Sequence, residues 1–292
     1  MDQTYTHPKR KTKVVFVQLG SPSEPTPKAL RKYLRKFLGD PRVIDINPWL
    51  WKIILNLFVL PFRPKKSAKL YARIWDGKSF PLITHTRDFT KNVGEELKKI
   101  DPDGHVEVNH AFLLSPPYVN EVYDSWEDDL KKGVGATKLL VIPMFPQYSE
   151  STIASGIDAL AKELSKRVKI PTFEVITNFH RTHAFIDNSV NQVDAKINEL
   201  QKQGKKIDSL IITFHGMQKR RIVNKGDDYY RHCYETFCLI TNKLQHIAPE
   251  QCMMSFQSRF GSEEWITPYT EEVVKKLISE GKKEIAIYSP SF

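Results

Sequence analysis

The sequence contains little cysteine and no motif that cradles a nucleotide phosphate. Its three cysteines, Cys233, Cys238 and Cys252, include no CxxC pair, which argues against a disulfide framework and against a cysteine-ligated iron–sulfur cluster. The patterns GxGxxG, GxxxxGK[ST] and GxSxG are missing as well, so a dinucleotide site, a P-loop and a hydrolase nucleophile elbow have no supporting residues. We therefore expect a ligand of another kind.

The chain also lacks an apolar stretch long enough to cross a bilayer. Residues 1–13 are polar and basic, unlike a signal peptide. Segment 49–60 is apolar at ten of its twelve positions but is interrupted by Lys52 and Asn56, and a spanning helix needs about 20 residues. Together with the unpaired cysteines, these features predict a cytoplasmic protein.

Two interpretations of segment 49–60 remain open. A buried helix accounts for its apolar residues. An exposed apolar lip also accounts for them, because Arg63, Lys65, Lys66 and Lys69 follow it and basic residues beside an apolar face favour anionic headgroups or carboxylates. In that case the segment would rest on a membrane surface or receive an apolar ligand.

Positive charge exceeds negative charge along the chain. There are 44 Lys and Arg residues against 34 Asp and Glu residues, and the net charge of +10 favours anionic partners. The excess is spread out, and the cluster Lys219-Arg220-Arg221 is short. Since zinc-finger spacing and a continuous basic helix are both missing, we expect no nucleic-acid partner.

Short apolar runs alternate with amphipathic segments, which is the pattern of an α/β fold with parallel sheets. The predicted strands are 13–19, 106–113, 138–143, 172–177, 209–214, 252–256 and 284–288. The predicted helices are 27–38, 119–132, 152–168, 183–203, 229–245 and 270–280.

The architecture is predicted to be used twice. Strand 14–17, which opens into Gly20, resembles strand 210–213, which opens into Gly216. Because the order of such elements repeats, we expect two similar Rossmann-like lobes with a ligand cleft between them. The predicted lobes are 1–168, which carries the lip at 49–60, and 169–292.

A histidine at the end of a strand is the strongest candidate for chemistry. The apolar run 210–214 ends on His215, and Gly216 follows directly. An imidazole at the carboxyl edge of a parallel sheet lies where α/β folds bind their ligands, and its ordinary pKa of about 6.5 suits proton transfer. The alternative is a core histidine that bonds to a backbone carbonyl.

Polar loops follow two further strands. Gln147, Tyr148 and Ser149 precede a predicted helix, where they either bind an anion or belong to a capping loop in which Ser151 and Thr152 satisfy the helix start. At Gly226-Asp227-Asp228-Tyr229, either aspartate is expected to cap the following helix.

The last polar loop is rich in aromatic residues. Phe256, Phe260 and Trp265 would form one side of a flat pocket, and Arg259 would pair with a carboxylate. Ordinary core packing explains each aromatic residue singly.

Taken together, these stretches resemble the ferrochelatases, lyases that insert Fe²⁺ into a porphyrin at the end of haem biosynthesis. They occur in the family's order from about residue 13 to residue 292. The matching stretches are Leu19-Gly20-Ser21-Pro22, Leu70-Tyr71-Ala72-Arg73-Ile74-Trp75, Phe145-Pro146-Gln147-Tyr148-Ser149, His215-Gly216, Gly226-Asp227-Asp228-Tyr229, Phe256-Gln257-Ser258-Arg259-Phe260-Gly261 and Trp265.

The resemblance implies two Rossmann-like lobes with a porphyrin cleft between them and a membrane-contacting lip at 49–60. It implies that His215 matches the family's active-site histidine, which accepts a pyrrole proton and faces the metal. Protoporphyrin IX and Fe²⁺ would be substrates, without a prosthetic group or an iron–sulfur cluster. The implied substrate-binding residues are Leu19, Gln147, Tyr148, Ser149, Phe256, Arg259 and Trp265.

One family feature has no counterpart in the sequence. The family carries a catalytic glutamate on a helix after its last strand, whereas this sequence stops at Ser289-Pro290-Ser291-Phe292. The second lobe is therefore expected to be truncated. A catalytically silent porphyrin- or haem-binding protein on the same scaffold is the alternative, and a chelatase for a more carboxylated tetrapyrrole is a third hypothesis.

Overall fold

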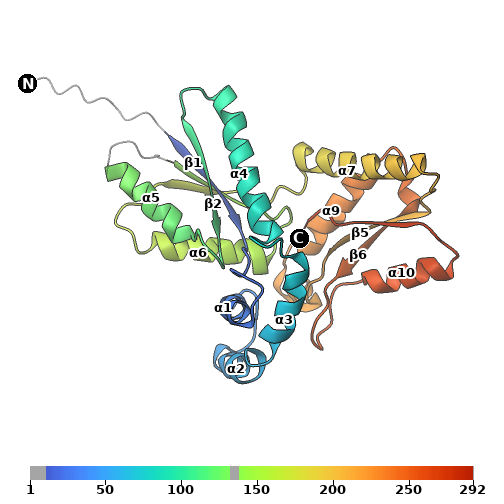
Figure 1. Ribbon diagram of the computed structural model, residues 1–292, viewed down its shortest axis with the longest axis horizontal. Coiled ribbons are helices and arrows are strands. Elements are labelled where there is room, and N and C mark those ends of the chain that lie inside the picture. The colour runs from blue at the N-terminus through green and yellow to red at the C-terminus, as the bar shows by residue number, and fades with distance from the viewer. Residues whose placement is uncertain (1–10, 132–137, 292) are drawn as a thin grey trace, which may run out of the picture. The chain divides into compact units, whose positions relative to one another are not determined.

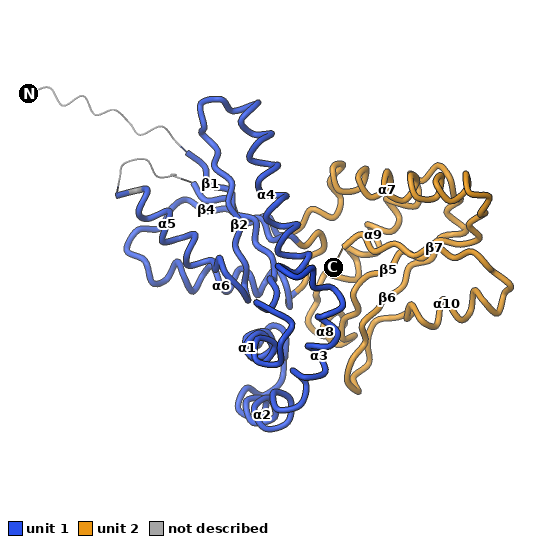
Figure 2. Tube along the Cα trace, viewed as in Figure 1, with its two compact units in different colours: residues 1–144, 150–177 blue, residues 145–149, 178–292 orange. Residues whose placement is uncertain are grey.

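The computed structural model describes residues 11–131 and 138–291 (Figure 1). The polar residues 1–10 and Lys132, the predicted last residue of a helix, lie outside these ranges. The chain divides into two compact units, and all strand pairs in their sheets are parallel (Figure 2). The predicted α/β class with two parallel sheets is confirmed. Unit 1 comprises 1–144 and 150–177, and unit 2 comprises 145–149 and 178–292.

Unit 1 contains a sheet with the strand order β2-β1-β3-β4. Its strands are β1 (Thr12–Gln18), β2 (Val106–Phe112), β3 (Lys138–Pro143) and β4 (Thr172–Val175). Its helices are α1 (Pro27–Leu38), α2 (Pro48–Ile54), the π-helix η1 (Leu55–Val59), α3 (Arg63–Tyr71), the 3₁₀ turn η2 (Ala72–Ile74), α4 (Pro81–Ile100), α5 (Val119–Lys131), the π-helix η3 (Glu150–Ala154) and α6 (Ser155–Leu164).

Alternation along β1 places helices on both faces of this sheet. Val15 and Val17 join a buried cluster with Trp126 of α5 and Leu160 of α6. Phe16, which points to the opposite face, packs edge-on against Phe89 of α4 with ring centroids 5.0 Å apart. A strand that is covered on both faces has a continuous apolar sequence, and the apolar run 14–17 therefore predicts this strand.

Unit 2 contains a sheet with the strand order β6-β5-β7. Its strands are β5 (Ser209–His215), β6 (Cys252–Gln257) and β7 (Ile285–Tyr288). Its helices are α7 (His183–Lys202), α8 (Lys219–Lys225), α9 (Tyr229–Thr241), the 3₁₀ turn η4 (Pro249–Gln251) and α10 (Thr270–Ser279).

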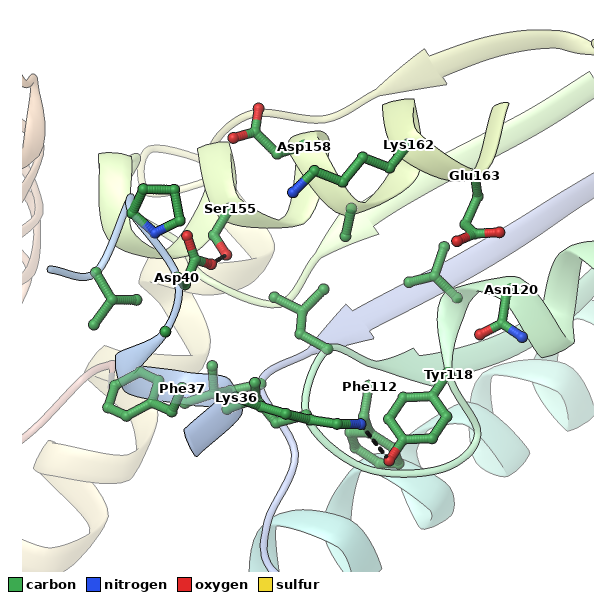
Figure 3. A pocket seen from close by; sticks show the side chains of 18 of the residues that line it. Lys36, Phe37, Asp40, Phe112, Tyr118, Asn120, Ser155, Asp158, Lys162 and Glu163 are labelled. Carbon is green, nitrogen blue, oxygen red and sulfur yellow. Dashed lines mark hydrogen bonds between the residues drawn. The ribbon is translucent and has the colours of Figure 1, made fainter. Parts of the chain in front are cut away.

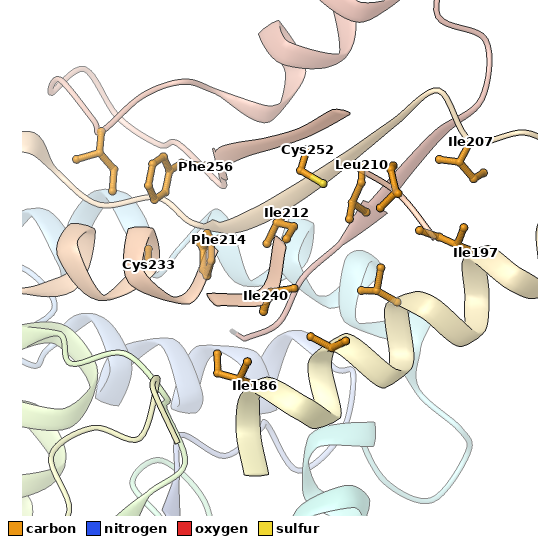
Figure 4. Packing of buried hydrophobic residues seen from close by; sticks show 14 of the residues in the cluster. Ile186, Ile197, Ile207, Leu210, Ile212, Phe214, Cys233, Ile240, Cys252 and Phe256 are labelled. Carbon is orange, nitrogen blue, oxygen red and sulfur yellow. The ribbon is translucent and has the colours of Figure 1, made fainter. Parts of the chain in front are cut away.

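The core of unit 2 forms on both faces of β5. Ile212 and Phe214 pack with Ile197 of α7 and Ile240 of α9 (Figure 4). On the other face, Ile211 packs with buried side chains of α10. Every residue of β5 before His215 is buried, so the apolar run of the sequence becomes the central strand.

The boundary between the units differs from the predicted one. We expected it near residue 168, but β4 pairs in parallel with β3, so unit 1 continues to Thr177. The segment 145–149 was expected in the first lobe but groups with unit 2. The reason is that the Gln147 side chain and the Tyr148 backbone donate hydrogen bonds to side chains of α9. Strand pairing and hydrogen bonding, which a single sequence does not specify, therefore set the boundary.

The capping predictions are resolved at two helices. Asp227 accepts a hydrogen bond at 2.9 Å from the Tyr229 backbone N–H, so the first of the two aspartates serves the start of α9. Ser151 and Thr152 lie inside η3, within a helical turn, and not in the loop before it.

The apolar segment 49–60 has a buried edge and an exposed face. Leu55 and Leu60 are buried in a cluster with side chains of α1. In contrast, Trp49 is 77% exposed and Phe58 is 65% exposed, and Phe62 just beyond is 72% exposed. The segment is therefore buried along one edge and exposed along the other, and its contact with a membrane or a ligand stays a prediction. Within the described ranges no helix is long and apolar enough to cross a membrane.

Candidate functional site

His215 lies at the carboxyl end of the central strand of unit 2. In the parallel pairing of β5 with β6, His215 lies opposite Gln257. It is the first residue of β5 that is not fully buried. Burial lowers the pKa of its imidazole below the ordinary value, so the ring is neutral at pH 7 and has a lone pair available for a proton. The predicted position of this histidine is confirmed by the strand bounds.

The first turn of α9 lies beside the backbone of His215. The side chain of Tyr229 lies beside the His215 backbone and the Cys233 thiol, and both influence its pKa. Tyr229 and Cys233 are both buried, and burial raises the pKa of each well above its usual range. The side chains of Tyr229 and Cys233 therefore stay neutral at pH 7. Of these three side chains, the His215 imidazole is the one that can take up a proton.

Gly216 permits a close approach behind the histidine. Its backbone N–H donates to the Gln257 carbonyl at 2.7 Å. A Cβ at this position would lie 2.8 Å from that carbonyl oxygen and 3.0 Å from Cε3 of Trp265. Only a residue without a side chain fits between the strand and the indole without moving one of them.

Trp265 is buried against this glycine. The neighbouring Ile266 N–H donates to the Met217 carbonyl at 2.9 Å, which attaches the Trp265 segment to the chain just after His215. Among the described residues, the indole Nε1 has no hydrogen-bond partner. A buried donor of this kind is available to an acceptor that arrives with a ligand.

The predicted aromatic wall is only partly assembled. Phe256 is buried and stacks on Tyr230 with ring centroids 5.7 Å apart. Phe260 is exposed and meets Trp265 edge-on at 6.4 Å. Phe256 therefore supports the end of β6 from inside the core, whereas Phe260 is exposed beside the buried Trp265.

Arg259 lies on the exposed loop after β6. Its guanidinium carbon lies 4.5 Å from the centroid of the Tyr269 ring, which is a cation–π geometry. We expected this arginine to pair with a carboxylate of the ligand. In the structure the aromatic ring holds it, and its charge remains on an exposed side chain.

The loop 147–149 is attached to α9 at two points. The buried Gln147 side chain donates from Nε2 to Oγ1 of Thr236 at 3.0 Å. The backbone N–H of Tyr148 donates to Nδ1 of His232 at 3.1 Å. Ser149 is buried as well. The loop is therefore part of the same compact unit as His215.

Sequence reasoning missed the histidines that hold this loop. The rings of His180 and His232 are stacked with centroids 3.8 Å apart, and His180 Nε2 lies 2.8 Å from a carboxylate oxygen of Glu235. The spacing of His232 and Glu235 on one helix face was the available signal. The partner His180 lies far away in the sequence and became visible only in the fold.

Leu19 lies in unit 1, at the end of β1. It lines a pocket of about 580 Å³ together with Phe37 and Phe112 (Figure 3). Lysines also line this pocket, and Lys36 Nζ donates to the Tyr118 hydroxyl at 2.8 Å. The volume falls within the range of pockets that hold small organic ligands.

No group of three or more His, Cys, Asp or Glu side chains in the described part of the chain is arranged to hold a metal ion.

The chain is an α/β protein of two Rossmann-like units with parallel sheets, and the second unit carries a histidine at a strand end. The sequence profile of the family described as Ferrochelatase matches residues 11–292. The chain belongs to the ferrochelatase family.

Known proteins resemble the chain over nearly its whole length. The ferrochelatase of Idiomarina loihiensis is 38% identical over 279 residues, which are 96% of this chain and 73% of that protein. The ferrochelatase of Pseudoalteromonas atlantica is 37% identical over 292 residues, covering 100% of this chain and 78% of that protein. The coproporphyrin III ferrochelatase of Streptococcus mutans is 37% identical over 287 residues, covering 97% and 83%.

Among solved structures, SirB from Bacillus subtilis with Fe³⁺ superposes with a TM-score of 0.47 and 13% sequence identity. The match covers 95% of this chain and 76% of that one.

Proposed function

We propose that this chain inserts Fe²⁺ into protoporphyrin IX to form haem, with His215 as the acceptor of a pyrrole proton. Membership of the ferrochelatase family supports metal insertion into a porphyrin. The observation that carries the role of His215 is its neutral imidazole at the carboxyl end of β5. The proposed enzyme is a cytoplasmic lyase.

The chemistry of insertion requires a base. A free porphyrin carries two pyrrole N–H protons, and both must leave before a divalent ion can lie in the ring plane. A neutral imidazole is a suitable acceptor near pH 7, and the burial that lowers the pKa of His215 keeps the ring in its basic form. Trp265 and the loop 147–149 would bound the substrate on the same unit.

The pocket in unit 1 suits a porphyrin of amphipathic character. Its wall includes the apolar side chains of Leu19, Phe37 and Phe112, and Lys162 and Lys166 also line it. Apolar walls would contact the ring, and the ammonium group of Lys162 would attract a carboxylate, whereas Lys166 pairs with Glu163 at 2.6 Å. We therefore include Leu19 among the proposed substrate-binding residues.

The role of His215 is tested by replacing it. His215→Ala should slow the insertion of Zn²⁺ or Fe²⁺ by about 10²- to 10⁴-fold, because that is the usual contribution of a general base. The measurement is the absorbance of the metalloporphyrin formed per unit time. His246→Ala, a substitution of an exposed histidine, is the matched control and should keep the parental rate.

A rate that survives in the His215→Ala variant would contradict the assignment of the base. Porphyrin binding without any acceleration by the parental chain would instead identify a porphyrin-binding protein without catalytic activity.

Choice of porphyrin is a separate question, because one relative is named for coproporphyrin III. We propose protoporphyrin IX, which carries fewer carboxylates. Competition between the two porphyrins in one reaction, with both products separated by chromatography, measures the ratio of their kcat/KM values. A ratio that favours coproporphyrin III would contradict the proposal.

We also propose that the exposed face of α2 and η1 contacts a membrane surface. Trp49, Leu57 and Phe58 are exposed there, and basic residues of α3 follow. Large apolar side chains beside lysines favour the interface of an anionic bilayer.

A further inference from the structure

We propose that the stacked pair His180 and His232 positions the loop 147–149, with the neutral Nδ1 of His232 as the acceptor that holds the loop in place. The proposal rests on the proposed function only where it concerns porphyrin. None of its parts involves the catalytic histidine, and all of its residues belong to unit 2.

The hydrogen bond from the Tyr148 N–H fixes the state of His232. Since a backbone N–H can only donate, Nδ1 must carry a lone pair to accept this hydrogen bond. A protonated ring would present an N–H to another N–H. The loop contact and protonation of His232 therefore exclude each other.

The surroundings of His232 keep it neutral. The residue is only 4% exposed, and burial is the main cause that lowers its pKa to about 4. His180 at the stacking distance and the Arg231 guanidinium, with Nη2 3.2 Å from Nε2, lower it further. Asp228 and Glu235 act in the opposite direction and do not outweigh these causes.

His180 is held against His232 by a carboxylate. Its Nε2 lies 2.8 Å from Glu235, which assigns the proton of the neutral ring to that nitrogen. The residue is 2% exposed, and burial lowers its pKa despite the carboxylate. Arg231 bonds to Glu235 at 3.0 Å from the other side. The carboxylate thus sets the plane of the ring on which His232 stacks.

The second attachment of the loop belongs to the same helix turn. Thr236 accepts from Gln147 and donates to the His232 carbonyl at 2.8 Å. One turn of α9 therefore holds both the side chain of Gln147 and the backbone of Tyr148. Loss of the His232 acceptor would remove one of these two attachments of the loop to α9.

The test uses the whole chain and two substitutions at one position. His232→Leu removes the acceptor, whereas His232→Asn keeps an oxygen near the position of Nδ1 and cannot be protonated. Hydrogen exchange of the Tyr148 amide should speed up about tenfold in His232→Leu, which is the effect of losing one hydrogen bond. Most of the protection should return in His232→Asn.

A pH series separates positioning from packing. After correction for intrinsic exchange, protection of the Tyr148 amide in the parental chain should fall as the pH drops through about 4. In His232→Asn this fall should be absent. His246→Leu, at an exposed position, is the control that should behave as the parent.

The link to porphyrin is measured as a KM. His232→Leu should raise the KM for porphyrin several-fold with little change in kcat, and His232→Asn should restore it. Equal amide protection in the parental chain and in His232→Leu would overturn the proposal. Equal KM values would overturn its link to the substrate. Amide exchange needs no turnover, so a failure of the proposed function is distinguishable from a failure of the positioning role.

Discussion

At the scale of single residues, the site around His215 depends on contacts that tolerate no added atom. Gly216 lies between the Gln257 carbonyl and the Trp265 indole, and both neighbours are within 3.0 Å of where a methyl group would stand. The Gln257 carbonyl belongs to β6 and the indole is buried, so neither can move without disturbing the core. The glycine is therefore a packing requirement of the strand end.

This requirement predicts opposite effects for two glycine substitutions. Gly216→Ala should lower the free energy of unfolding by about 1–3 kcal/mol, the usual cost of overpacking. Gly94→Ala in α4 is the control, because a Cβ at this position would meet open space. This substitution should raise the free energy of unfolding by about 0.5–1 kcal/mol. Urea denaturation measures both. Equal stabilities of the two variants would show that the contact distances around Gly216 do not matter.

At the scale of elements, the segment 49–60 is the clearest departure from an ordinary α/β fold. The Asn47 side chain caps α2 by accepting the Trp49 and Leu50 amides at 3.1 and 3.2 Å. One edge of the segment is anchored through Leu55 and Leu60. The cap and the anchor hold the helix while large apolar side chains face outward, an arrangement that costs stability unless something covers them.

Membrane contact predicts a loss of binding when this face is made polar. A double variant, Leu57→Ser with Phe58→Ser, should bind vesicles that contain phosphatidylglycerol at least about tenfold more weakly, because each lost side chain contributes about 1.5 kcal/mol or more. Co-sedimentation with the vesicles measures the bound fraction. Ile100→Ser is the control, since Ile100 is exposed at the end of α4. Unchanged sedimentation of the double variant would exclude the lip as the contact.

At the scale of the whole molecule, three histidines of unit 2 share a lowered pKa. Burial is the main cause for His180, His215 and His232. In the unfolded chain their pKa is about 6.5, so at mildly acidic pH the unfolded state binds more protons than the folded state. Their neutral forms therefore favour folding fully above about pH 6.5, and acid weakens this contribution.

The thermal midpoint should accordingly stay level from about pH 8 to pH 7 and should fall between about pH 6.5 and pH 4. Carboxylates with lowered pKa values, such as Asp158 and Asp208, lose their contribution only below about pH 5, so the part of this window above about pH 5 isolates the histidines. Differential scanning calorimetry measures the midpoint. His232→Asn should make the fall shallower. A midpoint that rises with acid would contradict the sign of all three shifts.

Local patterns in the sequence were enough to predict the strands, their parallel pairing and the position of His215 at a strand end. Apolar runs covered on both faces and the turn glycines are local patterns, so β3 and α1 have the bounds that were predicted and the other matched strands differ by a residue or two at an end. The family followed from short motifs at fixed places, and the profile match confirms it.

Which distant segments lie together became visible only in the folded chain. The stack of His180 on His232 and the attachment of Tyr148 to α9 join residues 52 to 84 positions apart, and no local pattern encodes such contacts. The unit boundary after Thr177 follows from pairing between β4 and β3. Likewise, Phe256 turned inward and Phe58 outward because burial depends on the neighbours that the fold supplies, and a single sequence does not specify these neighbours.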